Sequence, residues 1–145
     1  MRPTNNNERR SKGGDSTILE RCIILDSSAI FHIRDPSIIT SLRGRIYVTD
    51  KVLEELRDPR ALAIIDIVNP EKVTIDTKNI RRTQDLKDLS ETDISILICA
   101  EQLKNICREV IVVTDDIRLS KALRKRRIQV VSVYYPPDKG YRRKL

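Results

Sequence analysis

The sequence predicts an α/β fold in which a mostly parallel five-stranded sheet is covered by helices on both sides, a three-layer α/β/α domain. Three observations lead to this prediction. Short apolar runs, of the kind found in strands buried on both faces, alternate with segments whose apolar residues have helical spacing. Most of these runs are followed closely by a helix-starting residue, and 145 residues make about one domain. Strands that alternate with helices favour parallel pairing through right-handed crossovers.

The first half of the chain contains three of the predicted strands. Residues 22–25 form an unbroken apolar run, residues 45–48 form a second strand, and residues 73–76 alternate apolar and polar positions. Capping residues and prolines mark where the intervening helices begin. These signals predict helices over residues 27–31, 36–43, 50–58 and 61–68. Two helices therefore follow the second strand, and Pro59 separates them.

The second half contains the strongest predicted helix and two further strands. Residues 78–89 are polar and basic, which predicts a loop or a short exposed helix. Ser90 opens the next helix, in which a buried stripe with three-to-four spacing runs from Asp93 to Cys107. The remaining elements are expected to be strands over residues 110–113 and 128–133 and a helix that ends near residue 125.

The two ends of the chain differ from its interior. Residues 1–18 are polar and lack a hydrophobic period, so we expect a disordered tail ahead of one folded domain over residues 19–134. Residues 135–145 are expected to be a basic C-terminal tail. The chain carries 28 Lys and Arg against 21 Asp and Glu, a net charge of +7, and its pI is about 9.5. Such an excess favours a polyanionic partner, and nucleic acid is the first candidate.

Hydropathy and cysteine content both indicate an intracellular protein. No apolar run approaches the roughly 18 residues that a membrane span needs, and the N-terminus has no apolar signal core. We therefore expect a soluble, cytoplasmic protein. The three cysteines, Cys22, Cys99 and Cys107, lie in apolar segments without CxxC spacing. This pattern predicts buried reduced thiols in place of a disulfide framework or a zinc site.

Five acidic residues are placed so that folding would bring them together. Asp26 follows the first strand, Asp115 and Asp116 follow the fourth, Asp93 opens the helix before the fourth, and Glu55 lies after the second. If the first and fourth strands are neighbours where the winding reverses, these carboxylates share one edge of the sheet. Carboxylates about 4 Å apart repel by roughly 1–4 kcal/mol, so the group needs cations or protons. Oxygen ligands without His or Cys select Mg²⁺ or Mn²⁺, which can promote phosphodiester hydrolysis.

Each acidic residue also has a purely structural interpretation. The aspartates suit helix N-caps, and Asp93 is the fourth residue of a Ser-x-x-Asp sequence that resembles a capping box. Glu55 could pair with Lys51 on a solvated helix face. His32, the only histidine, has no Cys or His partner nearby in sequence, which favours a structural or RNA-contacting role over metal ligation. The functional interpretation rests on the expected position of all five acidic residues at one edge of the sheet, because residues that only cap separate helices have no reason to converge there.

Four short motifs, LDSSAI, VLEELRD, LSETDISIL and VVTDD, occur in an order and at a spacing that resemble the PIN-domain ribonucleases. The resemblance covers about residues 22–134 and implies a Rossmann-like sheet of strand order 3-2-1-4-5. It implies that the metal-binding and catalytic carboxylates are those of Asp26, Glu55, Asp93 and Asp116. It also implies that Asp115 is an additional metal-binding acid and that Thr114 is a supporting hydroxyl. The implied activity is an endoribonuclease that uses Mg²⁺ or Mn²⁺ and leaves 5′-phosphate and 3′-hydroxyl ends.

Within this family, the LSETDISIL and VLEELRD motifs are most similar to the endonuclease that matures the 3′ end of small-subunit ribosomal RNA in archaea and eukaryotes. That protein is typically followed by a four-cysteine zinc ribbon, and this chain reaches Leu145 without such cysteines. A VapC-type toxin, which is a PIN domain alone, is the alternative branch. The expected partners are accordingly ribosomal RNA or the pre-ribosome, a ribosome-assembly partner, an antitoxin, or a second copy of the chain in a homodimer.

Other functional classes have less support from the sequence. A non-catalytic RNA-binding or ribosome-assembly module with the same fold is the competing class. With four glycines and neither GxGxxG nor P-loop spacing, the chain is not expected to be a dehydrogenase or an NTPase. A phosphoacceptor receiver domain, which also gathers aspartates at such an edge, is a more distant alternative.

A basic helix and the turn after it provide a candidate RNA-binding surface. Six residues before the predicted fifth strand contribute to it: Arg118, Lys121, Arg124, Lys125, Arg126 and Arg127. Such a cluster neutralises phosphates and gives salt-dependent binding without reading base sequence. The alternative is a solvated basic helix face. Aromatic residues are scarce, with four Tyr and one Phe, so base stacking is expected to contribute little.

Overall fold

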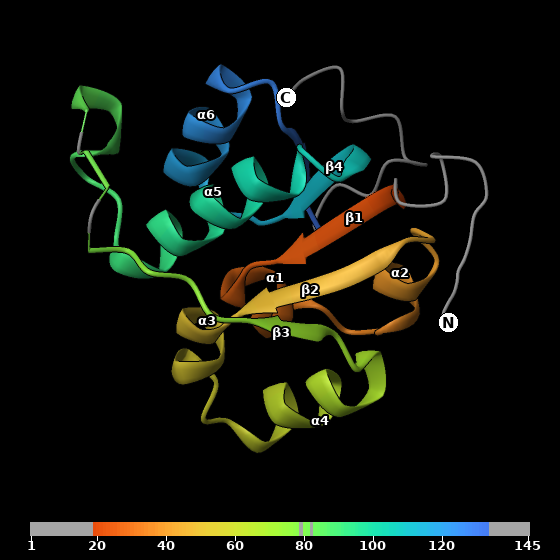
Figure 1. Cartoon of the computed structure of the whole chain (residues 1–145). Coiled ribbons are helices and arrows are strands. Elements are labelled where there is room, and N and C mark those ends of the chain that lie inside the picture. Colours follow the sequence, from red (N-terminus) through yellow and green to blue (C-terminus); the bar gives the residue numbers. More distant parts are fainter. Residues whose placement is uncertain (1–18, 79, 82, 134–145) are drawn as a thin grey trace, which may run out of the picture.

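The computed structural model describes residues 19–133 except 79 and 82, and these residues form a parallel sheet between two layers of helices (Figure 1). The strands are β1 (Leu19–Leu25), β2 (Arg45–Thr49), β3 (Glu71–Val73), β4 (Cys107–Val113) and β5 (Gln129–Val131). Neighbouring strands are parallel, and their order is β3-β2-β1-β4-β5. The fold class and strand order predicted from the sequence are confirmed. The tails predicted over 1–18 and 135–145 lie outside the described residues.

Helices connect the strands and cover both faces of the sheet. They are α1 (Ser27–His32), α2 (Ser37–Thr40), α3 (Asp50–Glu55), α4 (Pro59–Val68), α5 (Glu91–Leu103) and α6 (Ile117–Lys125), with a 3₁₀ turn η2 (Gln84–Leu86) in the segment predicted as a loop or short exposed helix. α5 and α6 pack together on one face, and α1 and α4 lie together on the other (Figure 1). None of the helices among the described residues has the length and apolar character that a bilayer crossing requires.

The register of the sheet brings the carboxyl ends of three strands to the same level. Leu25 of β1 pairs with Val113 of β4, and Val113 pairs with Val131 of β5. The pattern continues one residue further, since the backbone amide of Asp26 donates to the carbonyl of Val113 at 3.0 Å. The residues that follow β1 and β4 therefore lie side by side where the strand order reverses, the position at which open α/β sheets bind ligands.

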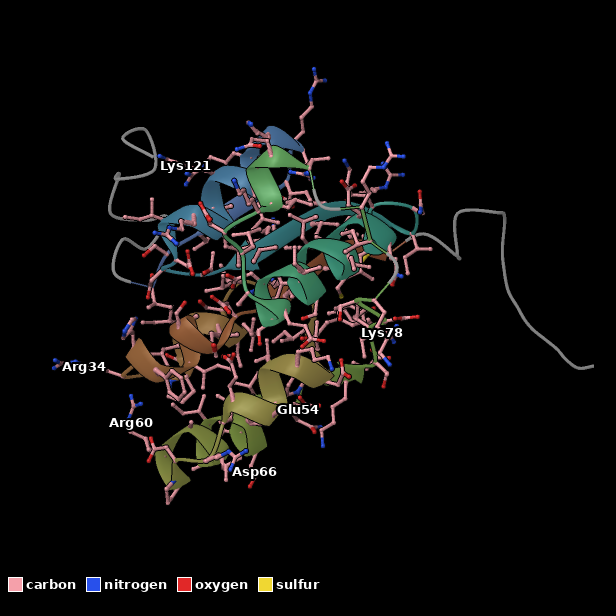
Figure 2. All side chains as sticks on the ribbon, turned by 90° about the vertical axis from the view of Figure 1, so that its left-hand side faces the viewer. Arg34, Glu54, Arg60, Asp66, Lys78 and Lys121 are labelled. Atoms are coloured by element: carbon pink, nitrogen blue, oxygen red, sulfur yellow. A yellow bond between two sulfur atoms is a disulfide. The ribbon has the colours of Figure 1, made fainter. Side chains whose placement is uncertain are left out.

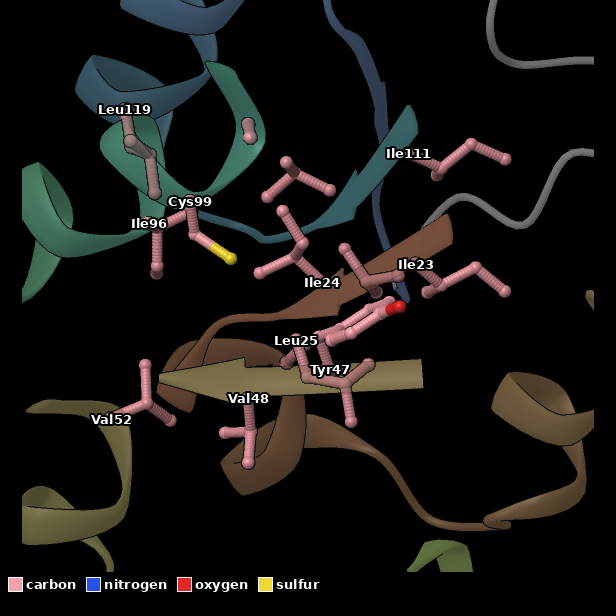
Figure 3. Close-up of a cluster of buried hydrophobic side chains, with 14 of the residues drawn as sticks. Ile23, Ile24, Leu25, Tyr47, Val48, Val52, Ile96, Cys99, Ile111 and Leu119 are labelled. Carbon is pink, nitrogen blue, oxygen red and sulfur yellow. The ribbon is translucent and has the colours of Figure 1, made fainter. Parts of the chain in front are cut away.

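Branched aliphatic side chains fill the space between the sheet and the helices (Figure 3). Ile23, Ile24 and Leu25 of β1 are fully buried, because the central strand is covered on both faces. Ile96 from α5 and Leu119 from α6 are fully buried as well. Burial of a side chain of this size stabilises a fold by roughly 1.5–3 kcal/mol, so this core holds the strand ends firmly in position.

Some element boundaries differ from the prediction. β3 ends at Val73, and the amide of Ile75 donates to the side chain of Asp50 at 3.1 Å. α5 ends at Leu103, and Cys107, which the spacing places on its buried stripe, is the first residue of β4. α2 and β5 are also shorter than predicted. These changes leave the order of elements unaltered.

The prediction of three reduced cysteines is wrong for two of them. Cys22 in β1 and Cys107 in β4 form a disulfide with Cα atoms 6.1 Å apart. The two cysteines lie on adjacent strands, with Cys22 opposite Val110 and Cys107 opposite Leu19, so the disulfide joins β1 to β4 across a stagger of three residues. Cys99 is a buried thiol as predicted, and its burial raises its pKa to about 11.

Candidate active site

Asp26 lies buried at the carboxyl end of β1. It caps the N-terminus of α1, where Oδ1 accepts a hydrogen bond from the backbone amide of Ser27 at 2.8 Å. Oδ2 accepts from the hydroxyls of Ser28 (2.9 Å) and Thr114 (2.6 Å). Only 3% of Asp26 is exposed, and burial raises the pKa of its carboxyl group although these hydrogen bonds oppose the shift. The charge of Asp116 raises that pKa further, so a cation or a proton near Asp26 is stabilising.

Thr114 connects Asp26 to the loop that carries Asp116. Its Oγ1 donates to Asp26 and accepts from the backbone amide of Asp116 at 3.0 Å. Asp116 in turn caps α6, since its Oδ1 accepts from the amide of Leu119 at 3.0 Å. Ser28 Oγ lies 3.3 Å from Thr114 Oγ1 and completes the link between the two strand ends. This arrangement suits the supporting role predicted for Thr114.

Asp93 reaches the same edge from the first turn of α5. It forms a capping box, in which Ser90 Oγ accepts from the amide of Asp93 at 3.1 Å and Asp93 Oδ2 accepts from the amide of Ser90 at 3.3 Å. Burial, followed by the charges of Asp116 and Asp26, raises the pKa of Asp93 to about 6. The three aspartates come from separate segments, and each lies within range of the others' charge.

The structural interpretation of these aspartates is therefore correct but incomplete. Asp26, Asp93 and Asp116 each cap a helix, and they also converge. Capping uses one oxygen of Asp93 and one of Asp116. The other oxygen of each, Oδ1 of Asp93 and Oδ2 of Asp116, accepts no hydrogen bond from the described part of the chain. These two oxygens are open to a cation.

Glu55, the last residue of α3, reaches the edge through hydroxyl groups. Its Oε1 accepts from Ser27 Oγ at 2.7 Å, and its Oε2 accepts from Thr92 Oγ1 at 2.6 Å. Ser27 follows Asp26 in the sequence, and Thr92 precedes Asp93. The carboxylate of Glu55 therefore connects the segment that carries Asp26 to the segment that carries Asp93. The alternative partner of Glu55, Lys51, instead lies 3.5 Å from Glu91.

Asp115 is held by a different set of partners. Its Oδ2 lies 2.9 Å from Nδ1 of His32, and its Oδ1 accepts from the hydroxyl of Ser132 and from the amide of Val133 at 3.2 Å. The side chain is only 6% exposed. The structure thus gives both Asp115 and His32 a structural partner at the ends of α1 and β5, and metal ligation by Asp115 stays a prediction.

The hydroxyl residues that orient the acids are the functional residues that the sequence analysis misses. Ser27 and Ser28 follow Asp26, and Thr92 precedes Asp93, so the signal is present in the motifs. Each hydroxyl donates to a carboxylate of the site. Serine and threonine beside a helix start are usually attributed to capping, which conceals this second role.

The donor chemistry of the edge fits a hard divalent ion, although the acids do not form a closed cage. Among the described residues, no group of three or more His, Cys, Asp or Glu side chains is close enough to hold an ion by itself. An ion at this edge would take one or two carboxylates, with water and substrate oxygens completing its coordination, as is common for Mg²⁺. The open oxygens of Asp93 and Asp116 are suitable first donors.

Most of the predicted RNA-binding residues are exposed beside this edge. The exposed residues on α6 and the turn after it are Arg118, Lys121, Arg124, Lys125 and Arg127. Figure 2 faces the carboxyl ends of the strands, and Lys121 projects from α6 at the rim of that view. Arg126 differs, because it is partly buried and pairs with Asp85 (2.7 Å) and Glu101 (3.8 Å). Arg126 thus joins η2 to α5 and α6.

The comparisons with known proteins agree with this geometry. The family described as the PIN domain of ribonuclease matches residues 23–103, which include Asp26, Glu55 and Asp93. The fold is similar to that of a PilT N-terminus domain protein from the hyperthermophilic archaeon Sulfolobus solfataricus. The TM-score is 0.53 with 10% sequence identity, and the match covers 78% of this chain and 87% of that chain. At this identity the similarity concerns the fold alone.

No curated protein matches the sequence. PIN domains are generally metal-dependent nucleases, which agrees with an acidic edge made of hard oxygen donors. The family match covers more than half of the residues and includes three of the four acids predicted to be catalytic. The chain therefore belongs to the PIN domain family of ribonucleases.

Proposed function

We propose that the protein is a divalent-metal-dependent endoribonuclease that hydrolyses RNA phosphodiester bonds at the edge formed by Asp26, Asp93 and Asp116. The observation that carries this proposal is the convergence of Asp26, Asp93 and Asp116 from three separate segments on one edge of the sheet, where burial and the charges of the other two aspartates raise the pKa of Asp93 to about 6. Helix capping alone does not require such a costly convergence. A bound cation removes the repulsion, and membership of a family of metal-dependent nucleases supplies the reaction class.

In this proposal Mg²⁺ or Mn²⁺ binds at the edge where the three aspartates converge. Asp93 and Asp116 offer open oxygens, and Asp26 contributes charge from the buried side of the edge. Asp115 has less support as a ligand, because His32 and the end of β5 occupy its carboxylate. A bound divalent ion would supply positive charge to the phosphate oxygens and acidify the attacking water.

Glu55 and Thr114 keep the aspartates in position in this proposal. Thr114 fixes Asp26 relative to the loop that carries Asp116, through one donated and one accepted hydrogen bond. Glu55 sets the spacing between the starts of α1 and α5 through Ser27 and Thr92. From that position Glu55 can also orient water or help to hold a second ion.

We assign the chain to ribosomal RNA maturation within the family, because the LSETDISIL and VLEELRD motifs resemble that branch. The substrate is then precursor small-subunit ribosomal RNA or the pre-ribosome, and the exposed cations of α6 contact its phosphates. A non-catalytic RNA-binding module is the second candidate. It is supported by the exposed cations of α6, which can bind RNA phosphates without any cleavage.

The decisive experiment is cleavage of labelled RNA that spans the 3′ end of small-subunit ribosomal RNA, with Mn²⁺, Mg²⁺ or EDTA. We expect metal-dependent cleavage that leaves 5′-phosphate and 3′-hydroxyl ends and that falls at least a hundredfold, about 2.7 kcal/mol of activation free energy, in Asp26→Asn. The matched control is Asp66→Asn, an exposed aspartate of α4 that should cleave as the wild type does (Figure 2).

The outcomes separate the candidates. A folded Asp26→Asn protein that cleaves at the wild-type rate contradicts the proposed site. RNA binding without cleavage under any metal condition favours the non-catalytic module. Cleavage of other RNAs, with the ribosomal precursor left intact, favours the toxin branch, in which an antitoxin is the partner.

A further inference from the structure

A small cavity lies next to the acidic edge, between α6 and β5. Its volume is about 160 Å³. The loop after β4, the first turns of α6 and the end of β5 provide its walls, through residues that include Thr114, Ile117, Ser120, Lys121, Arg124 and Val130. Thr114 is the link to the acidic edge, because its hydroxyl donates to Asp26. A ligand in this cavity is therefore a close neighbour of a substrate bound at the carboxylates.

The charge at the cavity favours an anion. Lys121 and Arg124 are one turn apart on α6, and both are exposed. Neither side chain forms an ion pair or a hydrogen bond within the described residues. Two like charges at this spacing repel each other on a helix, and a phosphate placed between them removes that repulsion.

One acidic residue also faces the cavity, and its charge is compensated from inside the protein. Asp115 accepts hydrogen bonds from the hydroxyl of Ser132 and the amide of Val133, and it contacts His32. With 6% of its side chain exposed, Asp115 presents little charge to solvent. Lys121 and Arg124 are the charged side chains of the cavity wall that are exposed to solvent.

The apolar part of the cavity wall is unusually accessible. Ile117 directly follows Asp116, yet it is 73% exposed, the largest value among the exposed large apolar side chains of the described residues. Val130 of β5 adds a second aliphatic surface. Such a surface suits the flat face of a nucleobase, which loses contact with water when it packs there.

We propose that this cavity is a nucleotide subsite for single-stranded RNA beside the bond that is cleaved. Lys121 and Arg124 bind the phosphate of one flanking nucleotide, and its base packs against Ile117. This inference rests on the proposed ribonuclease function, because the nucleotide in the cavity is the neighbour of the one that is cleaved. Thr114 belongs both to the cavity wall and to the acidic edge. It also separates two groups of basic residues on α6, those at the cavity and those outside it.

The test measures binding of a fluorescent single-stranded RNA of about 12 nucleotides to the full chain in EDTA, by anisotropy over a range of salt concentrations. We expect the double variant Lys121→Ala/Arg124→Ala to lose about tenfold or more in affinity and to lower the salt slope by about 0.7, one phosphate contact. The matched double variant Arg118→Ala/Lys125→Ala removes the same charge from the same helix outside the cavity. It should lose about threefold or less.

A second pair of variants tests the apolar contact. Ile117→Ala should weaken binding about threefold without changing the salt slope, whereas Ile106→Ala, which alters another exposed isoleucine away from the cavity, should leave affinity unchanged. Equal losses in the two charge variants, or no loss in Ile117→Ala, would overturn the subsite.

Cleavage with Mn²⁺ in the same variants distinguishes the two proposals. If the wild type does not cleave but the cavity variants lose binding selectively, the nuclease assignment fails and the subsite stands. If Asp26→Asn abolishes cleavage while both charge variants bind RNA equally, the subsite fails and the nuclease assignment stands.

Discussion

Replacement of Asp93 by Asn should stabilise the protein in the absence of metal while it removes activity. The pKa of Asp93 rises from its usual value of 3.8 to about 6 in the fold, through burial and the charges of Asp116 and Asp26. For a fully buried group this shift corresponds to roughly 3 kcal/mol of destabilisation in the ionised state. Because the side chain is only partly buried, solvent screening reduces the expected effect to about 1–1.5 kcal/mol. Asn keeps an oxygen that can accept from Ser90, so the capping box is preserved.

The size of the stabilisation depends on pH. A carboxyl group with a raised pKa contributes most to stability below its unfolded pKa of about 3.8, and that contribution is lost as pH rises through about 6. The Asp93→Asn variant should therefore gain most near pH 8 and roughly half as much near pH 5. Urea unfolding followed by far-UV circular dichroism in EDTA measures both values.

The exposed Asp66 of α4 provides the control for this experiment. Asp66→Asn should leave the urea midpoint unchanged at both pH values, since surface substitutions of this kind have small effects. An Asp93→Asn protein that is less stable than the wild type near pH 8, or equally stabilised at both pH values, would show that the ionised carboxylate of Asp93 is not destabilised at this edge. The stated basis for metal binding would then be lost.

The remaining predictions concern metal, the hydroxyl bridge and the disulfide. Mg²⁺ or Mn²⁺ at a hundred times its Kd should stabilise the wild type near pH 8 by about 2.7 kcal/mol, with reversal by EDTA, and an unchanged Tm would argue against a site. Thr92→Val removes the donor to Glu55 and should slow cleavage about tenfold, whereas Thr77→Val, whose hydroxyl bonds an exposed carboxylate, should not. Thr92→Ser should restore the rate, and equal rates for the two valine variants would contradict the bridge. Reduction of the Cys22–Cys107 disulfide, which joins residues separated by 85 positions, should lower stability by roughly 4.6 kcal/mol in a loop-entropy model. Dithiothreitol should therefore lower the urea midpoint, and an unmoved midpoint would contradict the cross-link.

The parts of the site that could be predicted from the sequence are those fixed by strand ends. Asp26 and Asp116 follow apolar runs, and parallel neighbours must finish at the same edge, so their proximity follows from the order of elements. Asp93 is predictable because the helical period places it at the start of a buried stripe. Backbone geometry alone therefore explains most of the acidic edge.

The parts that could not be predicted depend on side-chain contacts between distant segments. Spacing in the sequence suggests Lys51 as the partner of Glu55, but Glu55 accepts hydrogen bonds from two hydroxyl groups. This outcome depends on how α3 packs against α1 and α5. The disulfide joins Cys22 and Cys107, which are 85 positions apart in sequence and become neighbours only once β1 and β4 pair. The true end of β3 depends on a side chain, since Asp50 binds the amide that an alternating pattern assigns to a strand.

The capping role of the three aspartates has a consequence for how the domain behaves as metal concentration changes. The N-termini of α1, α5 and α6 all meet at the acidic edge, and the free amides there carry partial positive charge. This backbone charge offsets part of the mutual repulsion of the acids even when the solution contains no divalent ion. Exchange of an ion is then a local event at a preformed surface, and chelation should switch off chemistry without unfolding the chain.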